Sequence, residues 1–247
     1  MIQVLSEFCV QEKEEEDKQI FEYRQRSLRL SIQHPKAKNL NNLYIITTFS
    51  YQDSRSSSKI NLCKFIVPKI HRCEAKHIDL WNQNLTLDAF KAIVSAKHVR
   101  QLYLEDINIY ANDDNDEFPV EYIIQHCLNA SSITVNHIKS SNIICTKNNS
   151  SILADLFLNS KLKTFCIGGL NEHLNPQDFC TFMKNNGASG SRFTLSFKSN
   201  PSHEYISNLK KQIDVTKNFW LPSRGKPIVE LILPKKLIKK VHFLSNF

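Results

Sequence analysis

Residues 76–96, KHIDLWNQNLTLDAFKAIVSA, hold one complete strand, loop and helix, and they decide the fold. Apolar and polar side chains alternate over residues 77–81, which is the period of a strand with one buried face. A polar turn over residues 82–84 follows, and Thr86 can cap the N-terminus of a helix. Four apolar side chains then fall on one helical face: Leu87, Phe90, Ile93 and Val94. The segment therefore predicts a strand followed by an amphipathic helix.

The same unit recurs along the chain. Four further strand-like segments each precede a loop and an amphipathic helix: residues 99–104, 132–135, 162–167 and 193–197. The helix after residues 162–167 has a strong start signal, because Asn175 can cap it and Pro176 suits its first turn. The five strand centres are 24, 31, 32 and 30 residues apart. A near-regular period of this kind is typical of repeat proteins.

These repeats predict an α/β fold, a solenoid-like array of strand-loop-helix repeats with parallel strands. One strand and one helix cannot bury their apolar faces alone, whereas stacked neighbours share a core. The strand-loop-helix order is that of a leucine-rich repeat. We call the repeat degenerate because its steps exceed the usual ~20–29 residues and the strict leucine pattern is missing. An ordinary α/β sheet is the structural alternative, and regular curvature distinguishes the two.

The predicted organisation has four segments: a charged, helical N-terminal arm (1–35), an irregular first repeat or cap (36–74), the repeat array (75–220), and a final strand with a basic C-terminal cap (221–247). Within the second segment, we expect a strand over residues 40–49 and a mobile loop over residues 54–58. The final strand is expected over residues 228–233. The array has no internal boundary, because each repeat needs its neighbour.

The charge of the chain is unevenly distributed. Lys and Arg outnumber Asp and Glu by 32 to 24, which gives a formal charge of +8. Acidic runs lie at residues 12–17 and 113–117, and the densest basic run is at residues 235–240. We favour a mixed, solvated surface with a basic tail. The alternative is a nucleic-acid-binding protein that uses the basic run, because clustered basic side chains attract phosphate backbones.

The cysteines and apolar segments exclude several classes of protein. The seven cysteines include no Cys-x-x-Cys pair, so a zinc module is not expected. No stretch approaches the ~18 uninterrupted apolar residues that cross a bilayer, so no membrane association is predicted. Residues 1–10 lack the basic start of a secretion signal. We therefore expect a cytoplasmic or nuclear protein whose cysteines are small, buried apolar groups.

Three of these segments resemble a known family. Residues 78–86, 99–104 and 118–124 are similar to the nematode F-box-associated proteins of FTH-like type, and the resemblance extends over about residues 75–220. It implies a leucine-rich-repeat-like recognition region beside an F-box that docks on the Skp1 adaptor of a cullin ubiquitin ligase. Nothing in residues 1–35 fits an F-box, which begins with a Leu-Pro pair. The resemblance therefore supports substrate binding better than ubiquitination itself.

The sequence contains no catalytic constellation. Residues 187–190 read Gly-Ala-Ser-Gly, which is not the Gly-x-Ser-x-Gly of a nucleophile elbow, and we interpret them as a flexible exit from a helix. The acidic residues 113–117 lack the central Gly and distal Glu of a calcium loop. We therefore expect a non-enzymatic protein without a cofactor or a metal ion.

The candidate partner-binding residues are Asp79, Trp81, Gln101 and Tyr103. Strand alternation places Leu80 on the opposite face from Asp79 and Trp81. If Leu80 faces the core, Asp79 and Trp81 share the outer, concave face; otherwise Trp81 belongs to the core. An exposed Trp beside Tyr103 would be a strong anchor, because aromatic side chains give a large contact area at a small entropic cost.

Overall fold

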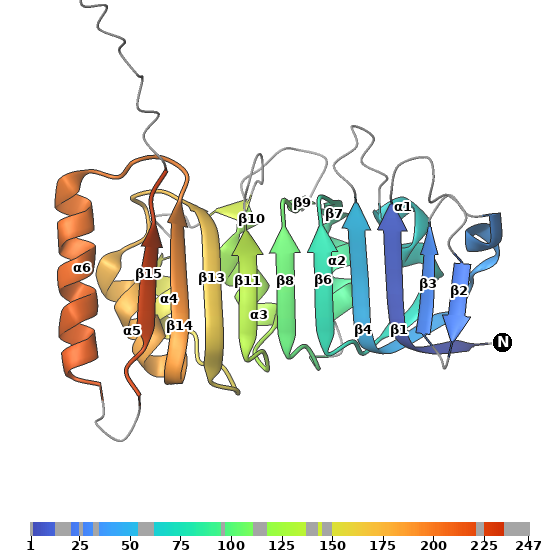
Figure 1. Ribbon diagram of the computed structural model, residues 1–247, viewed down its shortest axis with the longest axis horizontal. Helices are drawn as coiled ribbons and strands as arrows, with labels where there is room; N and C mark the ends of the chain where they lie inside the picture. Colours follow the sequence, from blue (N-terminus) through green and yellow to red (C-terminus); the bar gives the residue numbers. More distant parts are fainter. Residues whose placement is uncertain are drawn as a thin grey trace, which may run out of the picture.

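The computed structural model describes residues 2–12, 21–24, 27–31, 35–53, 62–94, 97–110, 118–136, 143–144, 150–220 and 225–234. Its strands stand side by side along the long axis in one eleven-stranded sheet, with helices behind it (Figure 1). The chain is thus an α/β protein with a large, mainly parallel sheet. Within the described residues, none of the helices combines the length and the apolar character needed to cross a membrane.

The sheet follows the order of the sequence over most of its width. From its C-terminal edge the strands are β15 (Ile228–Ile232), β14 (Gly187–Phe197), β13 (Leu162–Leu170), β11 (Ser132–Asn136), β8 (Gln101–Glu105), β6 (His77–Trp81), β4 (Leu43–Asp53), β1 (Gln3–Glu12), β3 (Ser27–Ser31) and β2 (Phe21–Arg24). The short strand β5 (Ile70–Cys73) also pairs with β4. All these pairs are parallel except β2 with β3.

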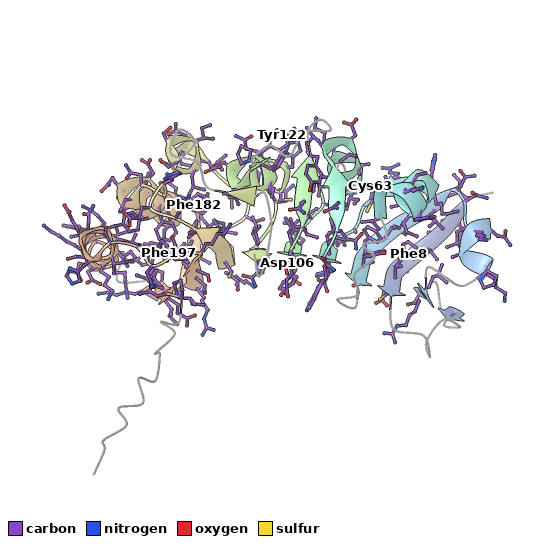
Figure 2. All side chains as sticks on the ribbon, turned by 90° about the horizontal axis from the view of Figure 1, so that it is seen from above. Phe8, Cys63, Asp106, Tyr122, Phe182 and Phe197 are labelled. Carbon is purple, nitrogen blue, oxygen red and sulfur yellow. The ribbon has the colours of Figure 1, made fainter. Side chains whose placement is uncertain are left out.

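The helices cover one face of this sheet, as the view from above shows (Figure 2). They are α1 (Leu62–Phe65), α2 (Leu87–Val94), α3 (Val120–His126), α4 (Ser150–Asp155), α5 (Pro176–Asn186) and α6 (His203–Asn218), with the 3-10 helices η2 (Pro35–Asn39) and η3 (Val67–Lys69). Two small parallel pairs connect neighbouring units: β7 (Asn84–Thr86) with β9 (Asn108–Tyr110), and β10 (Phe118–Pro119) with β12 (Ile143–Ile144). Helix α6 packs against α5 at the end of the molecule.

The five strand-loop-helix units predicted for residues 75–220 are confirmed as strands and helices, and so is the final strand, β15. Backbone hydrogen bonds join the units at equivalent positions before each strand. Arg100 N donates to Lys76 O at 2.8 Å, and Ser131 N donates to Arg100 O at 2.8 Å. Lys163 N donates to Ser131 O at 2.7 Å. The repeated bond therefore ties the second, third and fourth units each to the one before it.

The helical arm predicted for residues 1–35 is wrong for residues 3–12, 21–24 and 27–31, which are strands of the sheet. Strand β1 lies between β3 and β4 in the sheet. Leu5, Phe8 and Val10 are fully buried, whereas Glu7 is exposed. A β-bulge between Leu5 and Glu7 interrupts the alternation of buried and exposed side chains, so the sequence of β1 does not show the period of a strand.

In residues 36–74 the predicted strand is confirmed as β4, although it begins and ends later than expected. The predicted loop over residues 54–58 lies outside the described residues. So do the acidic run 113–117 and the basic run 235–240.

Two rows of apolar side chains cross the sheet on its helical face and form the core. In one row, side chains at most 2% exposed face each other from strand to strand: Phe8, Phe49, Ile78, Leu102, Ile133, Phe165 and Phe193. The second row includes Leu80, which is fully buried beside Tyr51 and Leu104. The residues between the two rows therefore lie on the opposite face, which we call the open face.

A buried asparagine at the end of α5 connects two units, and its removal should be costly. The side-chain oxygen of Asn186 accepts from Leu158 N at 2.8 Å, and its nitrogen donates to Leu156 O at 2.8 Å and Phe182 O at 3.0 Å. Asn186→Ala leaves buried backbone groups unpaired, so we expect a loss of about 2–4 kcal/mol in the free energy of unfolding. Urea denaturation measures it. The neighbouring Asn185→Ala is the control, and equal losses in the two variants would contradict this role.

Candidate functional site

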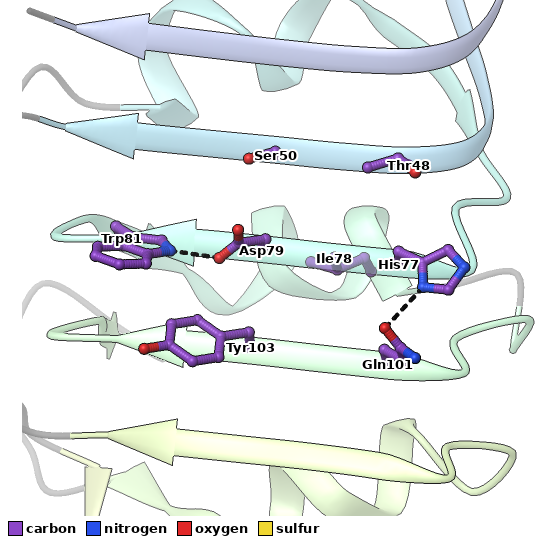
Figure 3. A pocket seen from close by; sticks show the side chains of 8 residues that line it. All are labelled: Thr48, Ser50, His77, Ile78, Asp79, Trp81, Gln101 and Tyr103. Atoms are coloured by element: carbon purple, nitrogen blue, oxygen red, sulfur yellow. Dashed lines mark hydrogen bonds between the residues drawn. The ribbon is translucent and has the colours of Figure 1, made fainter.

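The four residues predicted to bind a partner meet in one pocket on the open face. Because Leu80 is buried in the core, Asp79 and Trp81 lie on the open face, as the alternation requires. Gln101 and Tyr103 lie beside them on β8, paired in register with His77 and Asp79 of β6. All four line an open cavity of about 550 Å³ (Figure 3).

The residues that line the pocket lie on strands β4, β6 and β8. Its lining residues are Thr48, Ser50, His77, Ile78, Asp79, Trp81, Gln101 and Tyr103. Thr48 and Ser50 on β4 were not predicted from the sequence, and neither was His77. The alternation within residues 77–81 could have indicated His77, since it has the same parity as Asp79 and Trp81.

Two aromatic rings form the wall at the C-terminal ends of the strands. The rings of Trp81 and Tyr103 stack with their centroids 5.4 Å apart and their planes 27° apart. Trp81 Nε1 donates a hydrogen bond to Asp79 Oδ1 (Figure 3), and the Tyr103 hydroxyl donates to Glu105 Oε2. Each ring is thus held by a carboxylate on its own strand.

The other end of the pocket is polar. The His77 Nδ1 and Gln101 Oε1 atoms are 3.0 Å apart in a hydrogen bond across β6 and β8 (Figure 3). An amide oxygen can only accept, so the Nδ1 atom of His77 carries the proton. The hydroxyl-bearing residues Thr48 and Ser50 form the side of the pocket on β4.

Burial, with a smaller contribution from the carboxylates, raises the pKa of two groups at or near the pocket. Burial, followed by the hydrogen bond to Glu105 and the charge of Glu105, raises the pKa of Tyr103 to about 12, and the charge of Asp79 adds to this rise. Burial is also the first cause of the raised pKa of Cys9 on β1, and the charge of Asp79 adds to it. Tyr103 is therefore a neutral hydrogen-bond donor at physiological pH.

The raised pKa of Tyr103 predicts a pH dependence of stability. A folded-state pKa above the ordinary tyrosine value of 10.0 means that the native state holds the phenolic proton more tightly. This contribution is complete below pH 10.0 and is lost as the pH rises to about 12. Urea unfolding of wild type and Tyr103→Phe between these pH values should show the larger decline in wild type. Parallel pH profiles would contradict the shift.

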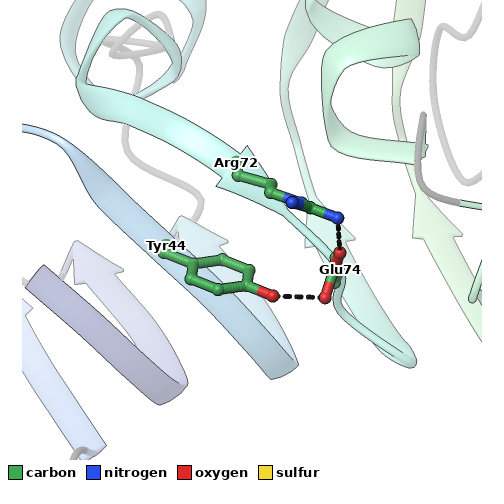
Figure 4. Close-up of polar contacts among 3 residues, drawn as sticks. All are labelled: Tyr44, Arg72 and Glu74. Carbon is green, nitrogen blue, oxygen red and sulfur yellow. Dashed lines mark hydrogen bonds and ion pairs between the residues drawn. The ribbon is translucent and has the colours of Figure 1, made fainter. Parts of the chain in front are cut away.

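A second polar cluster, at β4 and β5, is satisfied within itself (Figure 4). The Tyr44 hydroxyl donates to Glu74, and Arg72 forms an ion pair with the same carboxylate. The guanidinium of Arg72 also lies 5.5 Å from the Tyr44 ring centroid. The hydrogen bond from Tyr44 is the first cause of the lowered pKa of Glu74. The cluster fastens residues 70–74 to β4 and is not a candidate binding site.

The described residues provide no evidence of a metal site or of an activated thiol. They contain no group of three or more His, Cys, Asp and Glu side chains that could hold a metal ion. Burial raises the pKa of Cys73 to about 11 and that of Cys127 to about 12, the opposite of what a nucleophilic thiol needs. Cys73, Cys127 and Cys180 are buried as expected, whereas Cys9, Cys63 and Cys166 are only partly buried.

Comparisons of the chain with models of known families, with curated proteins and with solved structures found no match.

Proposed function

We propose that the chain is a non-enzymatic protein-binding module that holds its partner on the open face, around Trp81 and Tyr103. The observation that carries this proposal is the stacked pair of partly exposed rings beside a pocket at the centre of the open face. Aromatic side chains of this kind are enriched where protein interfaces have their binding energy. Their attachment to Asp79 and Glu105 fixes them before a partner arrives, which lowers the entropic cost of binding.

The finer fold that we propose is a degenerate leucine-rich-repeat solenoid. Its support is the strand order, which follows the sequence from β4 to β15, and the repeated bond between units. Equivalent residues of two units, Asn82 and Asp106, both adopt a φ of 52°, and the Asn108 Nδ2 atom donates to Asn84 Oδ1 at 2.9 Å. Repeat proteins of this type use their extended, strand-lined face to bind partners.

The family resemblance extends the proposal to a substrate-recognition subunit related to the F-box proteins of cullin ubiquitin ligases. Within residues 1–35, residues 3–12, 21–24 and 27–31 are strands of the sheet, a placement that favours substrate recognition over docking on Skp1. Size-exclusion chromatography of the full chain mixed with purified Skp1 and cullin tests this extension. Co-elution supports the ligase assignment, and separate elution removes it while leaving the binding module in place.

Selection from a random-peptide phage library tests the binding module without knowledge of its natural partner. The full chain is the target, and the enriched peptides are measured against Trp81→Ala and against Phe157→Ala. Phe157 is 67% exposed and follows α4, so its truncation removes an exposed aromatic ring away from the pocket. We expect Trp81→Ala to lose binding to the peptides and Phe157→Ala to retain it. Enriched peptides that bind both variants equally would refute a partner surface on the open face.

A further inference from the structure

The centre of the open face is acidic in a chain whose total charge is positive. On β6, β8 and β11 the residues of this face are His77, Asp79, Trp81, Gln101, Tyr103, Glu105, Ser132, Thr134 and Asn136. They include two carboxylates and no Lys or Arg, whereas the whole chain has a formal charge of +8. The charge of this central part of the open face is therefore complementary to a cation, whereas Arg29 on β3 and Arg192 on β14 lie on the same face nearer the edges of the sheet.

The two carboxylates belong to the same structure as the two aromatic rings. Asp79 accepts from the indole of Trp81, and Glu105 accepts from the hydroxyl of Tyr103. Neither of these two donors is a cation, so the two hydrogen bonds do not themselves neutralise the carboxylates. A ligand that reaches the rings therefore meets π-faces and negative charge together.

An arginine side chain has the chemistry that fits this combination. Its guanidinium is planar and weakly hydrated, stacks on aromatic rings and offers five donors to carboxylate and hydroxyl oxygens. The compact, strongly hydrated ammonium of lysine lacks the flat face, although it shares the charge. An acidic side chain would be repelled by Asp79 and Glu105.

On the basis of the proposed function, we infer that the pocket takes an arginine side chain of the bound protein. The guanidinium stacks on the face of the Trp81 ring that Tyr103 does not cover, and it forms an ion pair with Asp79. The hydroxyls of Thr48 and Ser50, on the β4 side of the pocket, accept its remaining N–H groups. At about 550 Å³ the cavity is larger than one side chain, so it also covers part of the neighbouring peptide.

Three blocked tripeptides test the inference: acetyl-Gly-Arg-Gly-amide, its citrulline counterpart and its lysine counterpart. Citrulline keeps the shape of arginine and removes the charge. Each is titrated into the ¹⁵N-labelled full chain, and the indole N–H signal of Trp81 is followed by NMR after assignment through Trp81→Phe. We expect saturable shifts with the arginine peptide and affinities at least tenfold weaker for citrulline. The lysine peptide should bind more weakly than the arginine peptide.

Matched carboxylate variants locate the ion pair. Asp79→Asn should weaken the affinity for the arginine peptide at least tenfold. Glu230→Gln is the control and should leave this affinity unchanged. Glu230 lies in the same cross-strand row, but on β15, outside the pocket, where it is 3.8 Å from Arg192. Equal affinities for arginine and citrulline, an unaffected Asp79→Asn variant, or no binding of the arginine peptide would each overturn the inference. Phage-selected peptides that still require Trp81 would then leave the binding module standing without an arginine site.

Discussion

Replacing Phe165 by alanine is expected to lower the free energy of unfolding by about 3–5 kcal/mol. Phe165 lies on β13 and is fully buried. Its ring centroid is 4.9 Å from that of Phe182 on α5 and 5.8 Å from that of Phe193 on β14. The substitution therefore removes a ring that joins two adjacent strands to the helix layer, and the packed surroundings can close the cavity only in part.

Urea denaturation measures this loss, with an unchanged dependence on urea concentration as the sign that the fold is retained. Phe157→Ala is the matched control, because the same truncation occurs at a side chain that is 67% exposed. The control should change the free energy by about 0.5 kcal/mol or less. A loss below about 1 kcal/mol for Phe165→Ala would mean that the aromatic cluster is not packed as described.

Replacing Trp81 by alanine is expected to weaken the binding of phage-selected peptides by about 30-fold or more, which corresponds to at least about 2 kcal/mol. The indole lines the pocket and is stacked on the ring of Tyr103. Since its ring lies outside the core, the fold should survive. The loss of the ring stack should cost about 0.5–1.5 kcal/mol of stability.

Isothermal titration calorimetry at fixed salt measures the affinity, and circular dichroism checks the fold. Tyr103→Phe keeps the stacked ring and removes only the hydroxyl that Glu105 accepts, so it should weaken binding much less than Trp81→Ala. The proposed anchor is wrong if Trp81→Ala and Tyr103→Phe have the same small effect.

The repeat array was predictable because its elements are decided by local sequence. Alternation marks β6, and a capping residue marks the start of a helix. Thr86 Oγ accepts from Ala89 N at 3.2 Å at the start of α2. Asn175 Oδ1 accepts from Gln177 N at 2.8 Å at the start of α5. Both predicted caps are confirmed.

Pairing between distant residues decides the parts that were not predictable. In β1, Leu5 faces Ile45 of β4, and the bulge that follows obscures the period of the strand. The flexible exit expected at residues 187–190 is wrong, because these residues begin β14, where Gly187 pairs with Leu162. A Cβ atom on Gly187 would lie 2.8 Å from the Met183 carbonyl oxygen, so this close approach requires glycine.

Part of the candidate site was also predictable from local sequence. Alternation about Leu80 was enough to place Asp79 and Trp81 on the open face. The contribution of β4 was not accessible, because Thr48 and Ser50 reach the pocket only through the pairing of β4 with β6. The choice of arginine as ligand also depends on the charge of neighbouring strands, which only the sheet order brings together.

The central claim is that a protein partner binds the open face, and the two tryptophan indole signals test it most directly. Trp81 lines the pocket, whereas Trp220 is 7% exposed and lies near Gly187, beyond the pocket-forming strands. Titration of a phage-selected peptide into the ¹⁵N-labelled chain should shift the Trp81 indole signal and the amide signals of β4, β6 and β8, and should leave the Trp220 signal unmoved. Saturating binding that shifts α2 to α5 and leaves the Trp81 signal in place would contradict the claim.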